Sequence, residues 1–116
     1  MATYCEIAKI YKTLSDPNRL RILNLLQQKK LCVCEITEIL NLATSTVSKH
    51  LSILQSVGFI EQEKEGKWVN YYINPRVSDA KKVALISFIQ SWIENEQAKE
   101  DEQKVKTVDR EKICSR

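Results

Sequence analysis

Two cysteines that are one residue apart, Cys32 and Cys34, form the most distinctive chemical feature of the sequence. Thiolates are soft ligands, so the pair suits As(III), Sb(III), Cd(II) or Pb(II) better than hard cations. Residues i and i+2 point about 200° apart on an α-helix but share a face of an extended segment. Joint ligation of one ion therefore predicts an unwound backbone around the pair. The alternative is that both cysteines are small buried hydrophobic side chains.

The charge that precedes the cysteine pair bears on its reactivity. Lys29 and Lys30 come directly before this segment, and a helix is expected to begin close to the thiols. Positive charge and a helix N-terminus both favour the thiolate form. We therefore expect both thiols to be activated.

A second group of polar residues lies along a predicted helix over 44–57. Val47, Leu51 and Leu54 recur at i, i+4 and i+7, which predicts that they face the core. The side chains outside that stripe are small or basic: Ser45, Thr46, Ser48, Lys49 and Ser52. Hydroxyl groups and one lysine suit a helix in the DNA major groove, where they reach phosphates and base edges. The alternative is an ordinary solvated helix.

Three further residues are candidates for DNA contact. His50, the only histidine, lies at the border of the core stripe, so it either bonds locally or touches DNA. Lys64 and Lys67 flank a Glu65-Gly66 turn and are placed to clamp a phosphate at the minor groove. The alternative for the lysines is a solvated hairpin tip.

The elements that must position these residues follow from periodicity and from helix capping. Helices are predicted over 3–14, 18–28, 31–40, 44–57 and 78–96, with strands over 59–64 and 67–73. Asp16 is expected to cap the second helix with Pro17 at its first position, Thr44 or Ser45 to cap the fourth, and Gly58 to end it. Pro75 is expected to end the hairpin. This order is typical of a winged helix-turn-helix: a mostly α fold with a β-hairpin wing.

Length and composition limit the remaining possibilities. The chain has 116 residues, which is enough for one domain. Its net charge of +3 is too weak to indicate nucleic-acid binding on its own. We expect a DNA-binding and dimerisation domain over 1–96 and a charged, flexible tail over 97–116. The last predicted helix is apolar nearly all round, so a second copy of the chain is expected to cover it. No membrane span or signal peptide is visible, which predicts a cytoplasmic protein.

Three segments together resemble one known family. Leu14-Ser-Asp-Pro-Asn-Arg-Leu-Arg-Ile-Leu, Leu31-Cys-Val-Cys-Glu-Ile and Ser45-Thr-Val-Ser-Lys-His-Leu are similar to the ArsR/SmtB winged-helix metalloregulators, over about residues 5–95. The resemblance implies a homodimer, joined through its first and last helices, that represses transcription on double-stranded operator DNA. It also implies release from DNA when a toxic ion binds, with no cofactor required for DNA binding. Leu-Cys-Val-Cys followed by an acidic residue resembles the arsenical and cadmium/lead branches, so As(III) is the expected inducer, with cadmium or lead next.

The resemblance also bears on the third ligand, because As(III) typically takes three sulfurs. Part of the arsenical branch has a third cysteine where this chain has Thr37. The cadmium/lead branch supplies N-terminal cysteines, which favours Cys5, and Cys114 is a further candidate. The zinc-sensing branch pairs His with Asp or Glu on the last helix; Asp79 and Glu94 are present without a histidine, so that site is predicted to be absent.

Ion binding is expected to stabilise a distorted conformer in which the two DNA-reading helices lose their spacing of about 34 Å. Two other kinds of regulator remain open: a thiol-redox switch that uses Cys5 or Cys114, and a constitutive DNA-binding module with inert cysteines. A thiol enzyme is disfavoured because the sequence has no Cys-x-x-Cys motif and no Gly-rich phosphate loop. We therefore predict that the protein is not an enzyme.

Overall fold

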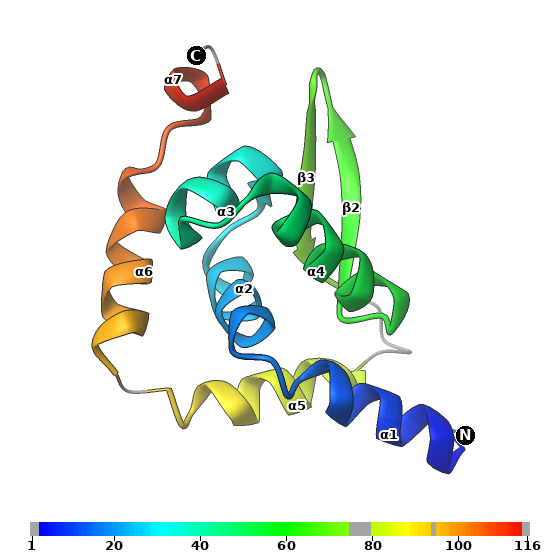
Figure 1. The fold of residues 1–116 in the computed structure, drawn as a ribbon. Helices are drawn as coiled ribbons and strands as arrows, with labels where there is room; N and C mark the ends of the chain where they lie inside the picture. The colour runs from blue at the N-terminus through cyan, green and yellow to red at the C-terminus, as the bar shows by residue number, and fades with distance from the viewer. Residues whose placement is uncertain (1–2, 75–79, 94, 115–116) are drawn as a thin grey trace.

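The computed structural model describes the backbone of residues 3–74, 80–93 and 95–114, and the side chains of these residues up to Ile113. A small sheet lies at one side of the helices, and its hairpin projects beyond them (Figure 1). In chain order the elements are α1 (Tyr4–Thr13), α2 (Pro17–Gln28), β1 (Leu31–Cys32), α3 (Val33–Leu40), α4 (Thr44–Ser56), β2 (Ile60–Glu65), β3 (Trp68–Ile73), α5 (Ala80–Gln90), α6 (Glu96–Thr107) and α7 (Arg110–Cys114). The predicted fold class, mostly α with a β-hairpin wing, is confirmed.

Local capping chemistry explains where most of the early helices begin and end. The Asp16 side chain accepts hydrogen bonds from the backbone N–H groups of Asn18 and Arg19 at 2.8 and 3.3 Å, with Pro17 at the first helical position. Gly58, with a φ of 86°, follows the last turn of α4 as predicted. The predicted cap of α4 is wrong: Ala43 occupies that position and makes no side-chain hydrogen bond.

The wing is an antiparallel hairpin with a third, very short strand beside it. The strand order is β1-β3-β2, and the register pairs Glu65 with Trp68 across the turn. The β1 strand pairs Cys32 with Asn70 of β3. The predicted helix over 31–40 therefore begins two residues late, at Val33, because this part of the chain is drawn into the sheet.

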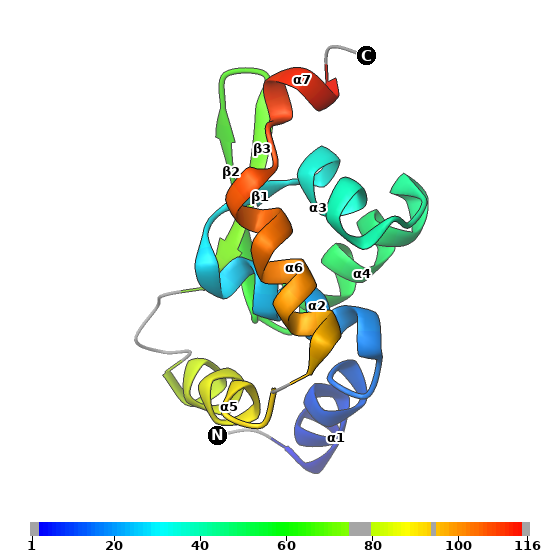
Figure 2. The same ribbon diagram turned by 90° about the vertical axis from the view of Figure 1, so that its left-hand side faces the viewer.

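The core lies between α2, α3, α4 and the base of the sheet (Figure 2). The predicted stripe of α4 is completely buried at Val47, Leu51 and Leu54. Between α3 and α4, Asn41 has a φ of 56° and its N–H donates to the carbonyl of Thr37 at 2.8 Å. This left-handed residue ends α3 and lets α4 start in a new direction.

The predicted helix over 78–96 is wrong in its extent. The α5 helix ends at Gln90, and α6 starts after Asn95, whose side chain accepts a hydrogen bond from the N–H of Ala98 at 2.8 Å. A strong N-cap residue favours a new helix start over continuation of the old one. Pro75, Asp79 and Glu94, on which other expectations rest, lie outside the described residues.

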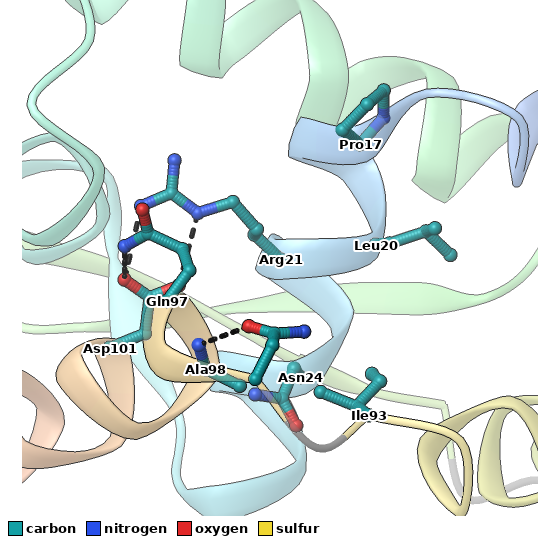
Figure 3. A pocket seen from close by; sticks show the side chains of 9 residues that line it. Pro17, Leu20, Arg21, Asn24, Ile93, Gln97, Ala98 and Asp101 are labelled. Atoms are coloured by element: carbon teal, nitrogen blue, oxygen red, sulfur yellow. Dashed lines mark hydrogen bonds and ion pairs between the residues drawn. The ribbon is translucent and has the colours of Figure 1, made fainter.

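The expectation of a flexible tail after residue 96 also differs from the structure. The α6 helix packs along α2 and buries Ala98, Asp101 and Val105. The Asp101 carboxylate accepts two hydrogen bonds from Arg21 at 3.0 Å and one from Gln97 at 3.0 Å (Figure 3). The charge-rich composition of α6 concealed this packing, because its buried acid, Asp101, has its cationic partner 80 residues earlier in the chain. No helix in the described part of the chain is both long and apolar enough to span a membrane.

Candidate thiol site and DNA-binding surface

Cys32 and Cys34 lie on either side of the junction between β1 and α3. Cys32 is the N-cap of α3, with φ −89° and ψ 168°, and its side chain is buried. Cys34 lies in the first helical turn and is half-buried, and both thiols are free. The backbone is therefore extended at the first cysteine and helical at the second.

The environment of Cys32 opposes ionisation. Burial raises the pKa of the Cys32 thiol, the backbone N–H of Glu35 lowers it, and the negative charge of Glu35 raises it again, for a net increase. Glu35 is itself buried, and its Oε1 accepts a hydrogen bond from the Cys32 N–H at 3.0 Å. Lys30 is directed elsewhere: its Nζ lies 2.8 Å from Glu63 Oε1. The expectation that neighbouring lysines favour the thiolate is therefore wrong for Cys32.

A surface hollow of about 350 Å³ opens beside the two thiols. Cys32, Val33 and Cys34 form one wall, and the start of β3 forms the other with Lys67, Trp68 and Val69. The ammonium group of Lys67 lies 4.8 Å from the centre of the Trp68 ring. The thiols thus share their open side with the base of the wing turn.

The described residues hold no cluster of three His, Cys, Asp or Glu side chains. Cys5 is exposed on α1, and in both ribbon views α1 and α3 lie on opposite sides of α2 (Figures 1 and 2). The Thr37 hydroxyl donates to the carbonyl of Cys34 at 2.8 Å. Cys114 ends α7, which packs against α3, but its side chain lies outside the described residues. Within one chain, Cys5 therefore does not lie beside Cys32 and Cys34.

Arg110 of α7 ties the C-terminal segment to the wing. Its guanidinium donates to Asn70 Oδ1 at 2.6 Å, lies 3.6 Å from Glu65 Oε1, and sits 5.1 Å from the centre of the Trp68 ring. Asn70 is buried and is the sheet partner of Cys32. The sequence alone does not single out Arg110, because it lies in a run of alternating charges.

The exposed face of α4 carries most of the predicted DNA-contacting residues. Ser45, Thr46, Lys49 and Ser52 are exposed, and Ser48 is half-buried. His50 is half-buried, and its Nδ1 lies 3.4 Å from a guanidinium nitrogen of Arg19, as the local-bonding alternative expects. Arg19 also donates to the carbonyl of Thr13 at 2.7 Å, which anchors it at the start of α2.

A hollow of about 490 Å³ beside α4 is lined by Asp16, Arg19, Ser45, Thr46, Lys49, His50 and Ile53. Arg19 is therefore a cation on this surface that periodicity did not identify. At the wing, Lys64 is exposed and pairs in register with Val69, and Lys67 is exposed beside Trp68. The structure places these lysines on the two sides of the Gly66 turn.

Comparison with known proteins identifies relatives of this chain. The sequence model of the bacterial regulatory proteins of the arsR family matches residues 16–62. The uncharacterized HTH-type transcriptional regulator MJ1325 of Methanocaldococcus jannaschii is 43% identical, over 63% of this chain and 83% of that protein. The arsenic resistance transcriptional regulator ArsR1 of Pseudomonas putida is 33% identical, over 72% of this chain and 69% of that protein. The cadmium resistance regulator CadC of Listeria innocua is 40% identical, over 59% of this chain and 58% of that protein.

Solved structures agree with these relatives. HlyU of Vibrio cholerae has a TM-score of 0.67 and 26% identity, over 76% of this chain and 91% of that one. The homodimeric winged helix-turn-helix domain of Mb0332 from Mycobacterium bovis has a TM-score of 0.63 and 28% identity, over 78% and 91% of the two chains. The chain therefore belongs to the arsR family and is a DNA-binding transcriptional regulator, not an enzyme.

Proposed function

We propose that this protein is a homodimeric repressor that leaves its operator when As(III) binds Cys32 and Cys34. The observation that carries the proposal is the position of the two thiols between two DNA-binding elements. Cys32 pairs with the wing through β3, and Cys34 lies in the first turn of α3, the first helix of the helix-turn-helix. A ligand held by both sulfurs acts on the wing and on the helix-turn-helix together.

The proposed DNA contacts combine α4 with the wing. We place α4 in the major groove, with Ser45, Thr46, Ser48, Lys49 and His50 toward phosphates and base edges. Lys64 and Lys67 approach the backbone beside the minor groove. Arg19 joins this surface from α2, where Thr13 and His50 hold its guanidinium close to α4. Binding then weakens steeply as salt rises. Because the proposed partner is operator DNA, we place the protein in the cytoplasm.

The homodimer is proposed from the surfaces of α1 and α5. Exposed by more than 40% are Tyr4, Ile7 and Tyr11 on α1, Phe88 on α5, and Trp92 just after the end of α5. Phe88 and Trp92 make an edge-to-face pair with ring centres 5.2 Å apart. Large exposed apolar groups of this kind mark interaction surfaces. The Mb0332 domain is described as homodimeric, and we assign the same arrangement to this chain.

The release of DNA that we propose depends on the backbone conformation at Cys32 and Cys34. With Cys32 extended and Cys34 helical, joint ligation favours a conformer in which the first turn of α3 is unwound. That conformer shifts α4 through the Asn41 turn and shifts β3 through the Cys32–Asn70 pair. We assign the third sulfur for arsenite to Cys5 of a second copy of the chain, with Cys114 on α7 as the alternative.

Cadmium is the second candidate inducer, because the CadC relatives at 40% identity are cadmium resistance regulators. Cd(II) is a soft cation that two or more thiolates bind well. Pb(II) and Sb(III) fit the same donors. A switch by oxidation needs Cys5 or Cys114 as a partner for the pair, since a disulfide between Cys32 and Cys34 is strained.

Fluorescence anisotropy of the reduced protein on the DNA upstream of its own gene tests the proposal. We expect arsenite to release the DNA, and Cys32→Ser and Cys34→Ser to bind DNA but no longer respond. Zinc, a borderline-soft cation, serves as the comparison ion, and cadmium and a mild oxidant run in parallel. DNA binding that ignores arsenite but responds to cadmium or the oxidant would replace the inducer and keep the repressor. DNA binding that responds to none of them would overturn the sensor function.

A further inference from the structure

We infer that Arg110 of α7 is a positioning residue for DNA binding, which holds the outer part of the wing, residues 64–68, against the body of the domain. Arg110 does not touch the DNA but acts through Lys64 and Lys67. This role rests on the wing contact of the proposed function and assigns the support of the wing to the C-terminal segment, which is α6 with α7. Three observations carry it: the path of that segment, the weak support of the wing by the sheet, and the contacts of the Arg110 guanidinium.

The C-terminal segment passes α2 and α3 before it reaches the wing. On α2, Arg21 holds the buried carboxylate of Asp101 by two hydrogen bonds of 3.0 Å. Near the end of α3, the Ile39 carbonyl accepts a hydrogen bond from Lys104 Nζ at 3.4 Å. In both ribbon views α7 lies at the height of the wing tip, above α2 and α3 (Figures 1 and 2). The segment is therefore fixed to the body of the domain before Arg110 meets the wing.

The outer part of the wing has little support from the sheet. The third strand, β1, pairs with β3 only at Asn70 and Tyr71. Beyond that point the ladder consists of β2 and β3 alone, and residues 64–67 are exposed. An isolated two-stranded hairpin is at best marginally stable in water. A contact from outside the sheet therefore has a large influence on where Lys64 and Lys67 lie.

The guanidinium of Arg110 makes three such contacts at once. It donates to Asn70 Oδ1 at 2.6 Å, lies 3.6 Å from Glu65 Oε1, and sits 5.1 Å from the centre of the Trp68 ring. Asn70 is 2% exposed, and its amide donates to Glu65 Oε2 at 2.8 Å. Without Arg110, the buried Asn70 oxygen loses its donor, which destabilises this arrangement more than the loss of a surface ion pair would.

A wing that is held in place increases DNA affinity by preorganisation. Ordering a mobile segment at the moment of binding costs free energy, and a segment that already lies in its bound position avoids that cost. In Arg110→Ala, Lys64 and Lys67 keep their charges but lose their fixed positions. The loss of DNA affinity should therefore not exceed the loss caused by removal of both lysines.

A double-mutant cycle tests this role by fluorescence anisotropy of the reduced full-length protein on the DNA upstream of its own gene. We expect Arg110→Ala to weaken DNA binding about three- to tenfold, within the range of coupling between interacting residues. In protein that carries Lys64→Ala/Lys67→Ala, the same substitution should change affinity by less than about twofold, because the groups that it positions are gone. In a Lys49→Ala background, where the wing is intact, the full loss should persist.

Two matched variants separate the position of Arg110 from its charge. Lys106→Ala removes one positive charge from an exposed site on α6 and should bind DNA within about twofold of wild type, because an exposed charge without a phosphate partner is screened by salt. Arg110→Lys keeps the charge but loses the planar group that meets an amide, a carboxylate and a ring together. We therefore expect Arg110→Lys to bind DNA more weakly than Lys106→Ala does.

Two further measurements distinguish wing support from a direct DNA contact and from general stability. A phosphate contact by Arg110 itself would lower the slope of log affinity against log salt by about 1 even without the wing lysines. Hydrogen exchange in the free protein should become faster in β2 and β3 of Arg110→Ala, while α4 keeps its protection.

The outcomes separate this role from the proposed function. Wild-type affinity in Arg110→Ala or Arg110→Lys, or an equal loss from Arg110→Ala with and without the wing lysines, would overturn the positioning role alone. So would faster exchange throughout α4. Wild-type affinity in Lys64→Ala/Lys67→Ala would overturn the proposed wing contact and the positioning role with it. A loss that disappears without the wing lysines, with faster exchange confined to the wing, supports both.

Discussion

Two regions of the molecule differ in how far their apolar side chains are buried. In α2, α3 and α4, the large apolar residues of the stripes are buried, and Leu25, Ile36 and Leu51 are completely inaccessible. On α1, Tyr4 is 93% exposed, and just after the end of α5, Trp92 is 71% exposed. The helix-turn-helix with its wing therefore buries its apolar residues within one chain, whereas α1 and the end of α5 carry the exposed apolar surface on which the proposed homodimer rests.

We expect the largest effect from substitutions that disrupt the exposed surface of the second region and leave the first region folded. Phe88→Glu together with Trp92→Glu places two charges on the exposed surface at the end of α5, so we expect a folded monomer. DNA affinity should fall by about 10²–10⁴-fold, because a second linked half-site contributes gains of that size. Analytical ultracentrifugation and anisotropy measure the two effects, with Gln103→Glu on the exposed face of α6 as the control. A variant that remains dimeric would show that the interface lies elsewhere.

A cavity in the first region, the helix-turn-helix with its wing, should have the opposite effect: it should lower the stability of the fold and not change the oligomeric state. We call this first region the self-contained region. Leu25→Ala removes a completely buried side chain and is expected to lower the free energy of unfolding by about 2–5 kcal/mol. Ile7→Ala on α1, where the side chain is 41% exposed, should change the stability of the monomeric Phe88→Glu/Trp92→Glu background by less than about 0.5 kcal/mol. Urea unfolding measures both. Equal losses at the two positions would remove the distinction between the regions.

The sequence was informative where periodicity and capping agree, and misleading where distant partners decide. The stripe of Val47, Leu51 and Leu54 and the Asp16 cap are local signals, and both are confirmed. The Asp101–Arg21 pair, by contrast, spans 80 residues, so no local pattern marks α6 as a packed helix. In the same way, Arg110 contacts the wing through Asn70, 40 residues away, and no spacing rule connects the two.

The cysteine pair shows the same division between local and distant information. Its spacing requires a departure from regular helix for both thiols to bind one ion; the backbone is extended at Cys32 and helical at Cys34, so this unwinding stays a prediction. The raised pKa of Cys32 was not predictable from the spacing, because burial at the β1–α3 junction causes it, while Lys30 pairs with Glu63 of the wing, 33 residues away. The third ligand for arsenite remains a prediction.

The boundary of the self-contained region is tested at Asp101. Asp101→Ala removes an acid that is 1% exposed and holds Arg21 and Gln97. Since hydrogen bonds to charged groups contribute about 1.5–3 kcal/mol and Arg21 can turn toward water, we expect a loss of about 1–3 kcal/mol. Glu100→Ala, one residue earlier and exposed, is the control. No change in the urea midpoint would mean that α6 is not part of the cooperative unit.

A smaller effect is expected at the start of α2. Asp16→Ala should cost about 1 kcal/mol, and Asp16→Asn should retain most of the cap. Burial raises the pKa of Asp16. The N–H groups of Arg19 and Asn18 and the charges of His50 and Arg19 together lower it by more, so the pKa lies below the ordinary carboxyl value. The cap therefore stabilises the protein fully above the ordinary carboxyl pKa, and its contribution is lost as pH falls through the lowered value. Asp16→Asn should remove that part of the acid sensitivity in thermal unfolding.

The smallest effect compares thiols from the two regions. Because burial raises the pKa of Cys32, its contribution to stability is complete below the ordinary thiol pKa and is lost as pH rises through the raised value. Cys32→Ala should flatten the alkaline end of the stability curve. Cys5→Ala, on the exposed surface of α1, should leave that curve unchanged. Thermal unfolding between neutral pH and pH 10 measures the difference, and identical alkaline slopes in the two variants would contradict it.

The 80-residue separation between Arg21 and Asp101 also has a consequence for synthesis. At about 5–20 residues per second, the ribosome adds Asp101 ~4–16 s after Arg21. Arg21 is 24% exposed in the finished protein, so water can serve its guanidinium during that interval. Asp101, at 1% exposure, needs a partner as soon as it is buried. The order of the two residues along the chain means that the more demanding charge arrives last, when the group that neutralises it is already in place.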